Sequence, residues 1–128
     1  MFHNMGRPIK ISDSEWEVMN VVWSRAPVAA SDVVEELATK KGWHSRTIRT
    51  LLDRLVKKKA LDSELEGKRY LYRPKVLMDV CVRQASQGFL QRVFSGEPGS
   101  MLIHLVQHAE LSPEEIAQLK RILSEKEK

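Results

Sequence analysis

The sequence is poor in cysteine and lacks a long hydrophobic run. Its single cysteine, Cys81, excludes a disulfide framework within the chain and is typical of proteins in a reducing compartment. The most apolar segments, residues 76–82 and 101–106, fall short of the roughly 20 apolar residues that span a bilayer. The N-terminus also lacks the pattern of a signal peptide. We therefore expect a soluble, cytoplasmic protein that does not interact with a membrane.

Motifs of enzymes are lacking as well. The sequence contains no Gly-rich phosphate loop, no Ser, His and Asp in a hydrolase order, and no cluster of metal ligands. Most carboxylates stand at predicted helix starts or on predicted solvent faces. We expect the protein not to be an enzyme, and we assign it no catalytic residue, no metal ligand and no cofactor.

Positive charge is concentrated in the N-terminal part of the chain. Residues 1–75 contain 15 Lys and Arg against 10 Asp and Glu, whereas residues 76–128 contain 6 against 7. The net charge of +4 thus arises from the first part. This asymmetry favours a polyanion as the partner of that part, although a solvated surface without a partner would carry the same charge.

Three amphipathic helices are predicted in the N-terminal half. The first begins at a capping box formed by Ser12 and Glu15, and the second covers about residues 31–41 and ends at Gly42. The third is capped by Ser45 and has the clearest helical periodicity. The predicted core positions of these helices are Trp16, Met19, Val22, Trp23, Val33, Val34, Leu37, Ile48, Leu51, Leu52, Leu55 and Val56.

A β-hairpin is predicted directly after the third helix. Residues 61–73 alternate between apolar and polar side chains around a turn at Gly67, and Pro74 ends the pattern. Three helices followed by a hairpin are the plan of a winged helix-turn-helix. The predicted fold class is therefore mainly α, with a winged-helix DNA-binding domain in residues 1–74 and a three-helix dimerisation domain in residues 75–128.

The outer face of the third helix predicts DNA binding. Six Lys and Arg and one Asp lie between Trp43 and Lys59, and a single helix fits the major groove while a hairpin lies along the backbone. A basic face that serves only solubility is the alternative. Asp53 would repel phosphate, so we expect it to pair with Lys57 or Arg49. Base reading is assigned to Arg46, Thr47, Arg49, Thr50 and Arg54, and backbone contacts to Trp43, His44, Ser45, Lys57, Lys58, Lys68 and Arg69.

The C-terminal half is predicted to contain three further helices. They cover about residues 75–95, residues 100–107, and a last segment that opens with Ser112, Pro113 and Glu115, which fit a capping box. Three helices of this length hardly form a core of their own, so we expect them to pack against a second copy of the chain. The residues assigned to dimerisation are Val80, Phe89, Leu90, Val93, Phe94, Leu102, Leu105, Ile116, Leu119 and Leu123.

Three segments resemble the penicillinase-repressor (BlaI/MecI) family: residues 14–19 (SEWEVM), residues 46–55 (RTIRTLLDRL) and residues 70–72 (YLY). The resemblance extends from about Ile11 to Lys126, and residues 46–55 are its most specific part. It implies a homodimeric transcriptional repressor that binds an inverted-repeat operator and dimerises through its C-terminal helices.

The chain departs from this family at two points. Family members that control β-lactam resistance are inactivated by a sensor-activated protease at an Asn-Phe bond, and the matching position here is His104-Leu105. Either the protease reads other residues at this candidate switch, or the protein does not use it. Copper-responsive relatives carry a CxCxxxxCxC motif, whereas this chain has only Cys81, so copper sensing by thiolates is not expected.

Other functions of the same fold remain open at this stage. His104 and His108 have a spacing that places two imidazoles on one metal, but no third ligand accompanies them. Cys81 would suit a redox sensor only if it were exposed with a lowered pKa. A winged helix that binds protein instead of DNA is the main alternative, and its binding would depend little on salt. Residues 6–8 are a candidate minor-groove arm.

Overall fold

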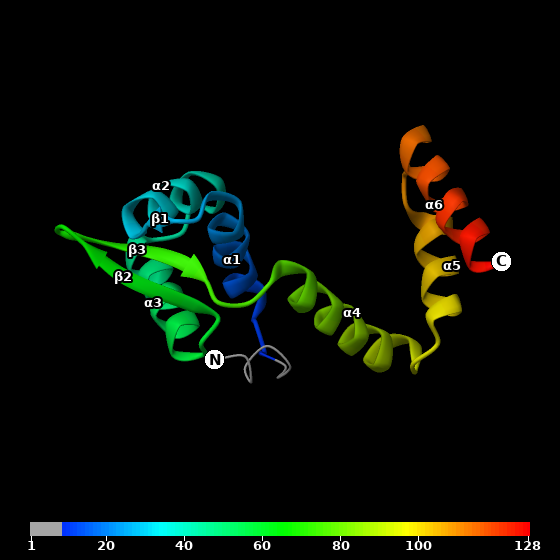
Figure 1. Cartoon of the computed structure of the whole chain (residues 1–128), viewed down its shortest axis with the longest axis horizontal. Coiled ribbons are helices and arrows are strands. Elements are labelled where there is room, and N and C mark those ends of the chain that lie inside the picture. The colour runs from blue at the N-terminus through cyan, green and yellow to red at the C-terminus, as the bar shows by residue number, and fades with distance from the viewer. Residues whose placement is uncertain (1–8) are drawn as a thin grey trace. The chain divides into compact units, whose positions relative to one another are not determined.

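Six helices and three short strands make up the part of the chain that the computed structural model describes, residues 9–128 (Figure 1). The candidate arm at residues 6–8 lies outside it. The mainly α fold with three helices and a hairpin is confirmed. None of the described helices is long and apolar enough to cross a membrane. The elements are α1 (Asp13–Arg25), β1 (Val28–Ala29), α2 (Ala30–Lys41), α3 (Ser45–Lys57), β2 (Leu61–Glu66), β3 (Arg69–Pro74), α4 (Met78–Phe94), α5 (Pro98–His108) and α6 (Pro113–Lys126).

Three of the predicted helix ends are confirmed, and others differ. The Ser12 and Ser112 capping boxes are both present, and Gly42 ends α2 with a φ of 69°, a left-handed conformation that suits glycine. The predicted cap of α3 is wrong: His44 occupies the cap, where its Nδ1 accepts from the Arg46 N–H at 3.2 Å. α4 begins later than predicted, because the Lys75 N–H is bonded to the Ala60 carbonyl.

The predicted hairpin forms the larger part of a three-stranded antiparallel sheet in the order β1-β3-β2. The register opposes Ser63 to Tyr72 and Leu65 to Tyr70. Because side chains alternate between the two faces of a sheet, these four residues share one face of the hairpin. β1 was not predicted; its Val28 pairs with Tyr72 and covers the other edge of β3.

The core of the winged-helix unit lies between α1, α2, α3 and the sheet. Four of the five apolar residues predicted at the inner face of α3 are buried, and the fifth, Val56, is half-buried. Trp16, Trp23 and Val34 are half-buried as well. The Trp23 indole N–H donates to the Val76 carbonyl at 3.1 Å, which anchors the segment that follows the hairpin. The fully buried large side chains include Met19, Leu37, Ile48, Leu52, Leu55 and Leu61.

Glu15 is the buried charged residue of the described chain, with only 1% of its surface exposed. Its carboxylate accepts from the Lys58 ammonium and from the Ser12 N–H at 2.9 Å. Burial by itself opposes ionisation, but the hydrogen bonds from Lys58 and Ser12 outweigh it and hold the pKa of Glu15 below its usual value of 4.5. The pair joins the start of α1 to the end of α3.

The lowered pKa of Glu15 predicts acid sensitivity of this unit. A carboxylate with a folded-state pKa below its unfolded value stabilises the fold above the unfolded value, and this contribution is lost as the pH falls through the folded value. Glu15→Gln should therefore lower the free energy of unfolding by about 1–2 kcal/mol at pH 7, and the difference from wild type should shrink below pH 4.5. Urea unfolding at pH 7 and pH 3 measures this, with Glu17→Gln on the same helix as the control. A pH-independent difference would contradict it.

The described chain divides into two compact units, one ending at Gln84 and the other formed by Ala85–Lys128. The division falls inside α4 because Val76 and Cys81 pack into the winged-helix core. In Ala85–Lys128, all of which is described, no side chain is buried. The ten residues assigned to dimerisation are exposed or half-buried in the single chain, so their burial against a second copy stays a prediction.

Candidate nucleic-acid interface

The packing of α3 determines which of its side chains are available to a ligand. Ile48, Leu52 and Leu55 are completely buried. Because the helix repeats every 3.6 residues, fixing this face in the core turns the polar face outward. The structure exposes all five residues that are predicted to read bases, namely Arg46, Thr47, Arg49, Thr50 and Arg54.

The residues predicted to contact the DNA backbone fall into three places. Lys68 and Arg69 are exposed at the turn of the hairpin, beside Gly67. His44 and Ser45 are exposed at the start of α3, while Trp43 is half-buried and packs against the core. The last two residues of the set, Lys57 and Lys58, lie at the end of α3.

Lys57 and Lys58 differ in their surroundings. The Lys57 side chain is exposed, whereas the Lys58 ammonium donates to the Lys10 carbonyl at 2.7 Å and to the Glu15 carboxylate. A phosphate would have to compete with Glu15 for the Lys58 charge. Sequence reasoning missed this partner because it lies 43 positions away.

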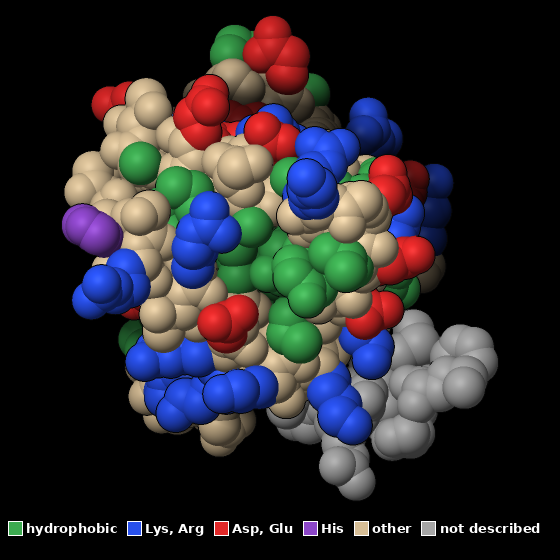
Figure 2. All heavy atoms as spheres, turned by 90° about the vertical axis from the view of Figure 1, so that its left-hand side faces the viewer, with side chains coloured by type: hydrophobic (Ala, Val, Ile, Leu, Met, Phe, Trp, Pro, Cys, Tyr) green, Lys and Arg blue, Asp and Glu red, His purple; other side chains and the backbone are tan. Residues whose placement is uncertain are grey.

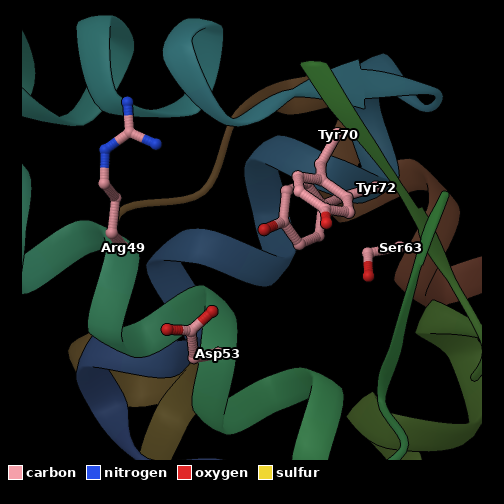
Figure 3. A pocket seen from close by; sticks show the side chains of 5 residues that line it. All are labelled: Arg49, Asp53, Ser63, Tyr70 and Tyr72. Carbon is pink, nitrogen blue, oxygen red and sulfur yellow. The ribbon is translucent and has the colours of Figure 1, made fainter. Parts of the chain in front are cut away.

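A hollow of about 480 Å³ separates the outer face of α3 from the hairpin. It is lined by Arg49 and Asp53 from α3 and by Ser63, Tyr70 and Tyr72 from the hairpin (Figure 3). Burial, together with the negative charge of Asp53, raises the pKa of Tyr72. Ser63, Tyr70 and Tyr72 were not among the predicted site residues, although the alternation of residues 70 and 72 already placed both tyrosines on one face.

Asp53 does not make the ion pairs that the sequence suggested. The ion pairs found among residues 9–128 join it neither to Lys57 nor to Arg49. Figure 3 shows the Arg49 side chain extending away from Asp53, whose carboxylate borders the hollow.

Basic side chains gather on the face of the molecule at the hairpin side. Figure 2 shows several Lys and Arg side chains in a band along the lower edge of this face, below a central apolar patch, with Asp and Glu side chains elsewhere on the face. The hairpin itself exposes Leu65 and Tyr70, at 58% and 53% of their surfaces. A band of basic side chains beside a few apolar and aromatic ones suits a duplex, whose phosphates lie outside the groove that exposes the base edges.

Cys81, His104 and His108 were considered as sensor groups. Cys81 is buried, and burial raises the pKa of its thiol, which lowers the reactive thiolate fraction. The rings of His104 and His108 lie 4.6 Å apart between centroids, and both residues are exposed. Within the described residues, no group of three or more His, Cys, Asp or Glu is placed to hold a metal.

The fold and this surface define a winged-helix protein of the DNA-binding class. A family model described as penicillinase repressor matches residues 11–125. The chain is 35% identical over 117 residues to the methicillin resistance regulatory protein MecI of Staphylococcus aureus strain N315, covering 91% of this chain and 95% of MecI. It is 37% identical over 116 residues to the penicillinase repressor of Bacillus licheniformis, covering 91% of each. The chain belongs to the penicillinase repressor family, as the sequence resemblance implied.

Solved structures agree on the winged-helix part. The solution structure of the DNA-binding domain of the repressor BlaI has a TM-score of 0.54 and 37% identity, and covers 59% of this chain and 93% of that domain. The monomeric form of Bacillus licheniformis BlaI in complex with the blaP half-operator has a TM-score of 0.52 and 36% identity, covering 58% and 90%. The winged-helix fold predicted from the sequence is thus found in relatives of known structure.

Proposed function

We propose that this chain is a cytoplasmic transcriptional repressor that binds an inverted-repeat operator as a homodimer. The chain belongs to a repressor family. The observation that carries the proposal is that α3 exposes a basic face beside the basic turn of the hairpin. Occupation of promoter DNA by two winged helices would then block transcription. Operator half-sites should be spaced by about 10 base pairs or a multiple, one turn of DNA.

Within this proposal, base reading and phosphate contact fall to different residues. Arg46, Arg49 and Arg54 suit guanine, whose O6 and N7 accept two hydrogen bonds from one guanidinium. Lys57, Lys68 and Arg69 lie at the end of α3 and at the hairpin turn, where a basic side chain would meet phosphate. The structure of BlaI, a relative with the same fold, in complex with a half-operator supports DNA binding by the winged helix of this chain.

The second part of the proposal is dimerisation through residues 75–128. Large apolar side chains on α4, α5 and α6 remain exposed in the single chain, among them Phe89, Leu102 and Leu123. A monomer that exposes so many would be prone to association. Pairing also increases operator affinity, because the second winged helix binds at a high effective concentration once the first is bound.

The candidate proteolytic switch lies in this C-terminal part. His104 and Leu105 are exposed residues of α5. A cut between them by a sensor-activated protease would separate α4 from α6 and weaken the dimer, which would release the operator. The test is to incubate the protein with the sensor-activated protease from the same cells and to sequence the fragments. A fragment that begins at Leu105 would support this switch, and an uncut chain would contradict it.

The proposal is tested by a gel-shift titration with DNA from upstream of the protein's own gene. Wild type should bind tightly at about 50 mM salt and lose about a thousandfold or more of its affinity at about 200 mM, since bound Lys and Arg release counterions. Arg49→Ala should weaken binding about tenfold or more, because one bidentate guanine contact is removed from each half-site.

The matched control is Arg83→Ala, which removes the same charge from an exposed α4 ion pair with Asp79 and should leave affinity nearly unchanged. Binding that Arg49→Ala leaves intact would contradict base reading by α3. Absence of DNA binding at both salt concentrations would contradict autoregulation and favour the protein-binding alternative.

A further inference from the structure

Asp53 is the acidic residue of α3, a helix that otherwise carries three arginines and a lysine among its charged side chains. It lies on the exposed face, one helical turn after Arg49. A carboxylate at this place opposes the attraction of the surrounding residues for phosphate. An ionised carboxylate only accepts hydrogen bonds, so on the proposed reading face it would be matched by a partner that donates them.

The protein itself supplies no cation for this carboxylate in the described residues. Their ion pairs do not include Asp53, and its neighbours across the hollow are the hydroxyl-bearing residues Ser63, Tyr70 and Tyr72. The hollow of about 480 Å³ leaves the carboxylate open to an incoming group (Figure 3). Asp53 thus keeps its acceptor oxygens available when DNA arrives.

The major-groove edges of the four bases differ in what they offer a carboxylate. Guanine presents two acceptors, thymine an acceptor and a methyl group, and adenine an acceptor beside its amino donor. Cytosine alone presents a donor, its 4-amino group, without a neighbouring acceptor of its own. An aspartate on a reading helix is therefore matched to cytosine and mismatched to guanine and thymine.

Arg49 and Asp53 complement each other in this respect. They are separated by four positions, so that their Cβ atoms lie about 6 Å apart on one side of α3. A guanidinium suits the O6 and N7 of guanine, and a carboxylate suits the 4-amino group of cytosine. The two side chains together fit a C·G pair, or a guanine and a cytosine in neighbouring pairs.

We propose that Asp53 is a specificity-determining residue that selects a cytosine next to the guanine read by Arg49. The inference rests on the proposed function, because it requires α3 to lie in the major groove. In this role Asp53 lowers affinity for DNA in general through repulsion from phosphate, and favours sites with a cytosine at one position of each half-site.

The first experiment selects preferred sites from a random-sequence duplex library with the full-length wild type, Asp53→Ala and Asp53→Asn. Wild type should enrich cytosine at one position of each half-site. Asp53→Ala should reduce that preference about tenfold, leave the other positions unchanged, and bind unrelated duplex more tightly. Asp53→Asn should shift the preference toward adenine, since an amide pairs with the N6 and N7 of that base.

The second experiment isolates the amino group. A duplex of the selected site carries, at that position, a cytosine analogue with hydrogen in place of the 4-amino group. Wild type should bind this duplex about tenfold more weakly than the unmodified one, while Asp53→Ala should bind both equally. Equal binding of both duplexes by wild type would overturn the inference.

The control is Asp79→Ala, which changes the net charge by the same amount on α4 and should leave the base preferences as in wild type. Identical preferences for wild type and both Asp53 variants would overturn the inference while leaving the proposed function standing. Failure of wild type to enrich any site would overturn both. Thermal melting of each variant confirms its fold, and the isosteric Asp53→Asn keeps the test valid if Asp53→Ala unfolds.

Discussion

Leu102→Asp is expected to dissociate the proposed homodimer, raising its dissociation constant at least about a hundredfold. Leu102 lies on α5 and exposes 48% of its surface in the single chain. On a helical projection it shares one side of α5 with Leu105 and Val106. A carboxylate buried in the proposed apolar interface loses its hydration without gaining a partner, which costs several kcal/mol, and each 1.4 kcal/mol corresponds to about tenfold.

Sedimentation velocity of the purified protein over a range of concentrations measures this effect. The control is Gln107→Asp, a change of the same charge at an exposed position on a different side of α5, which should leave the dimer intact. The dissociated variant should also lose operator affinity, because its two winged helices no longer bind as a linked pair. A stable Leu102→Asp dimer would show that this side of α5 is not part of the interface.

Much of the winged-helix unit could be predicted because its signals are local. The capping box at Ser12, the glycine that ends α2 and the apolar stripe of α3 each depend on residues within a turn or two. β1 escaped prediction because a strand of two residues has no periodicity. Its position depends on pairing with Tyr72, more than 40 positions later.

The candidate interface was predictable to the extent that it depends on one helix. The periodicity of α3 separates its buried from its exposed residues, and the structure exposes every residue assigned to base reading. The hollow with the two hairpin tyrosines was missed because it depends on how the hairpin packs against α3. The cap of α3 was misplaced because the cap depends on a histidine rotamer, while Ser45 is the more common capping type.

The C-terminal helices show a different limit. Their boundaries follow from local signals such as the capping box at Ser112. Their burial does not, because in Ala85–Lys128 no side chain is buried within the single chain. Residues such as Phe89 and Leu102 were assigned to an interface from hydrophobicity alone, and only the assembled protein reveals which of them meet a partner.

Lys58→Ala is expected to lower the free energy of unfolding of the winged-helix unit by about 2–3 kcal/mol at pH 7. The substitution leaves the carboxylate of Glu15 buried without its cation, which typically costs 3–5 kcal/mol for a fully buried pair. The lower figure applies because the Lys58 side chain is 34% exposed, so water replaces part of the lost interaction. Urea unfolding followed by tryptophan fluorescence measures this unit selectively, since Trp16, Trp23 and Trp43 all lie within it.

Two variants separate this effect from a general loss of positive charge. Lys57→Ala, one position earlier on α3, removes an exposed lysine and should change the unfolding free energy by less than about 0.5 kcal/mol. Combining Lys58→Met with Glu15→Gln removes both charges and should restore most of the lost stability, because no buried charge is left unpaired. If the double variant were as unstable as Lys58→Ala, an unpaired buried charge would not be the cause, and the lost hydrogen bond from Lys58 to the Lys10 carbonyl would account for the loss instead.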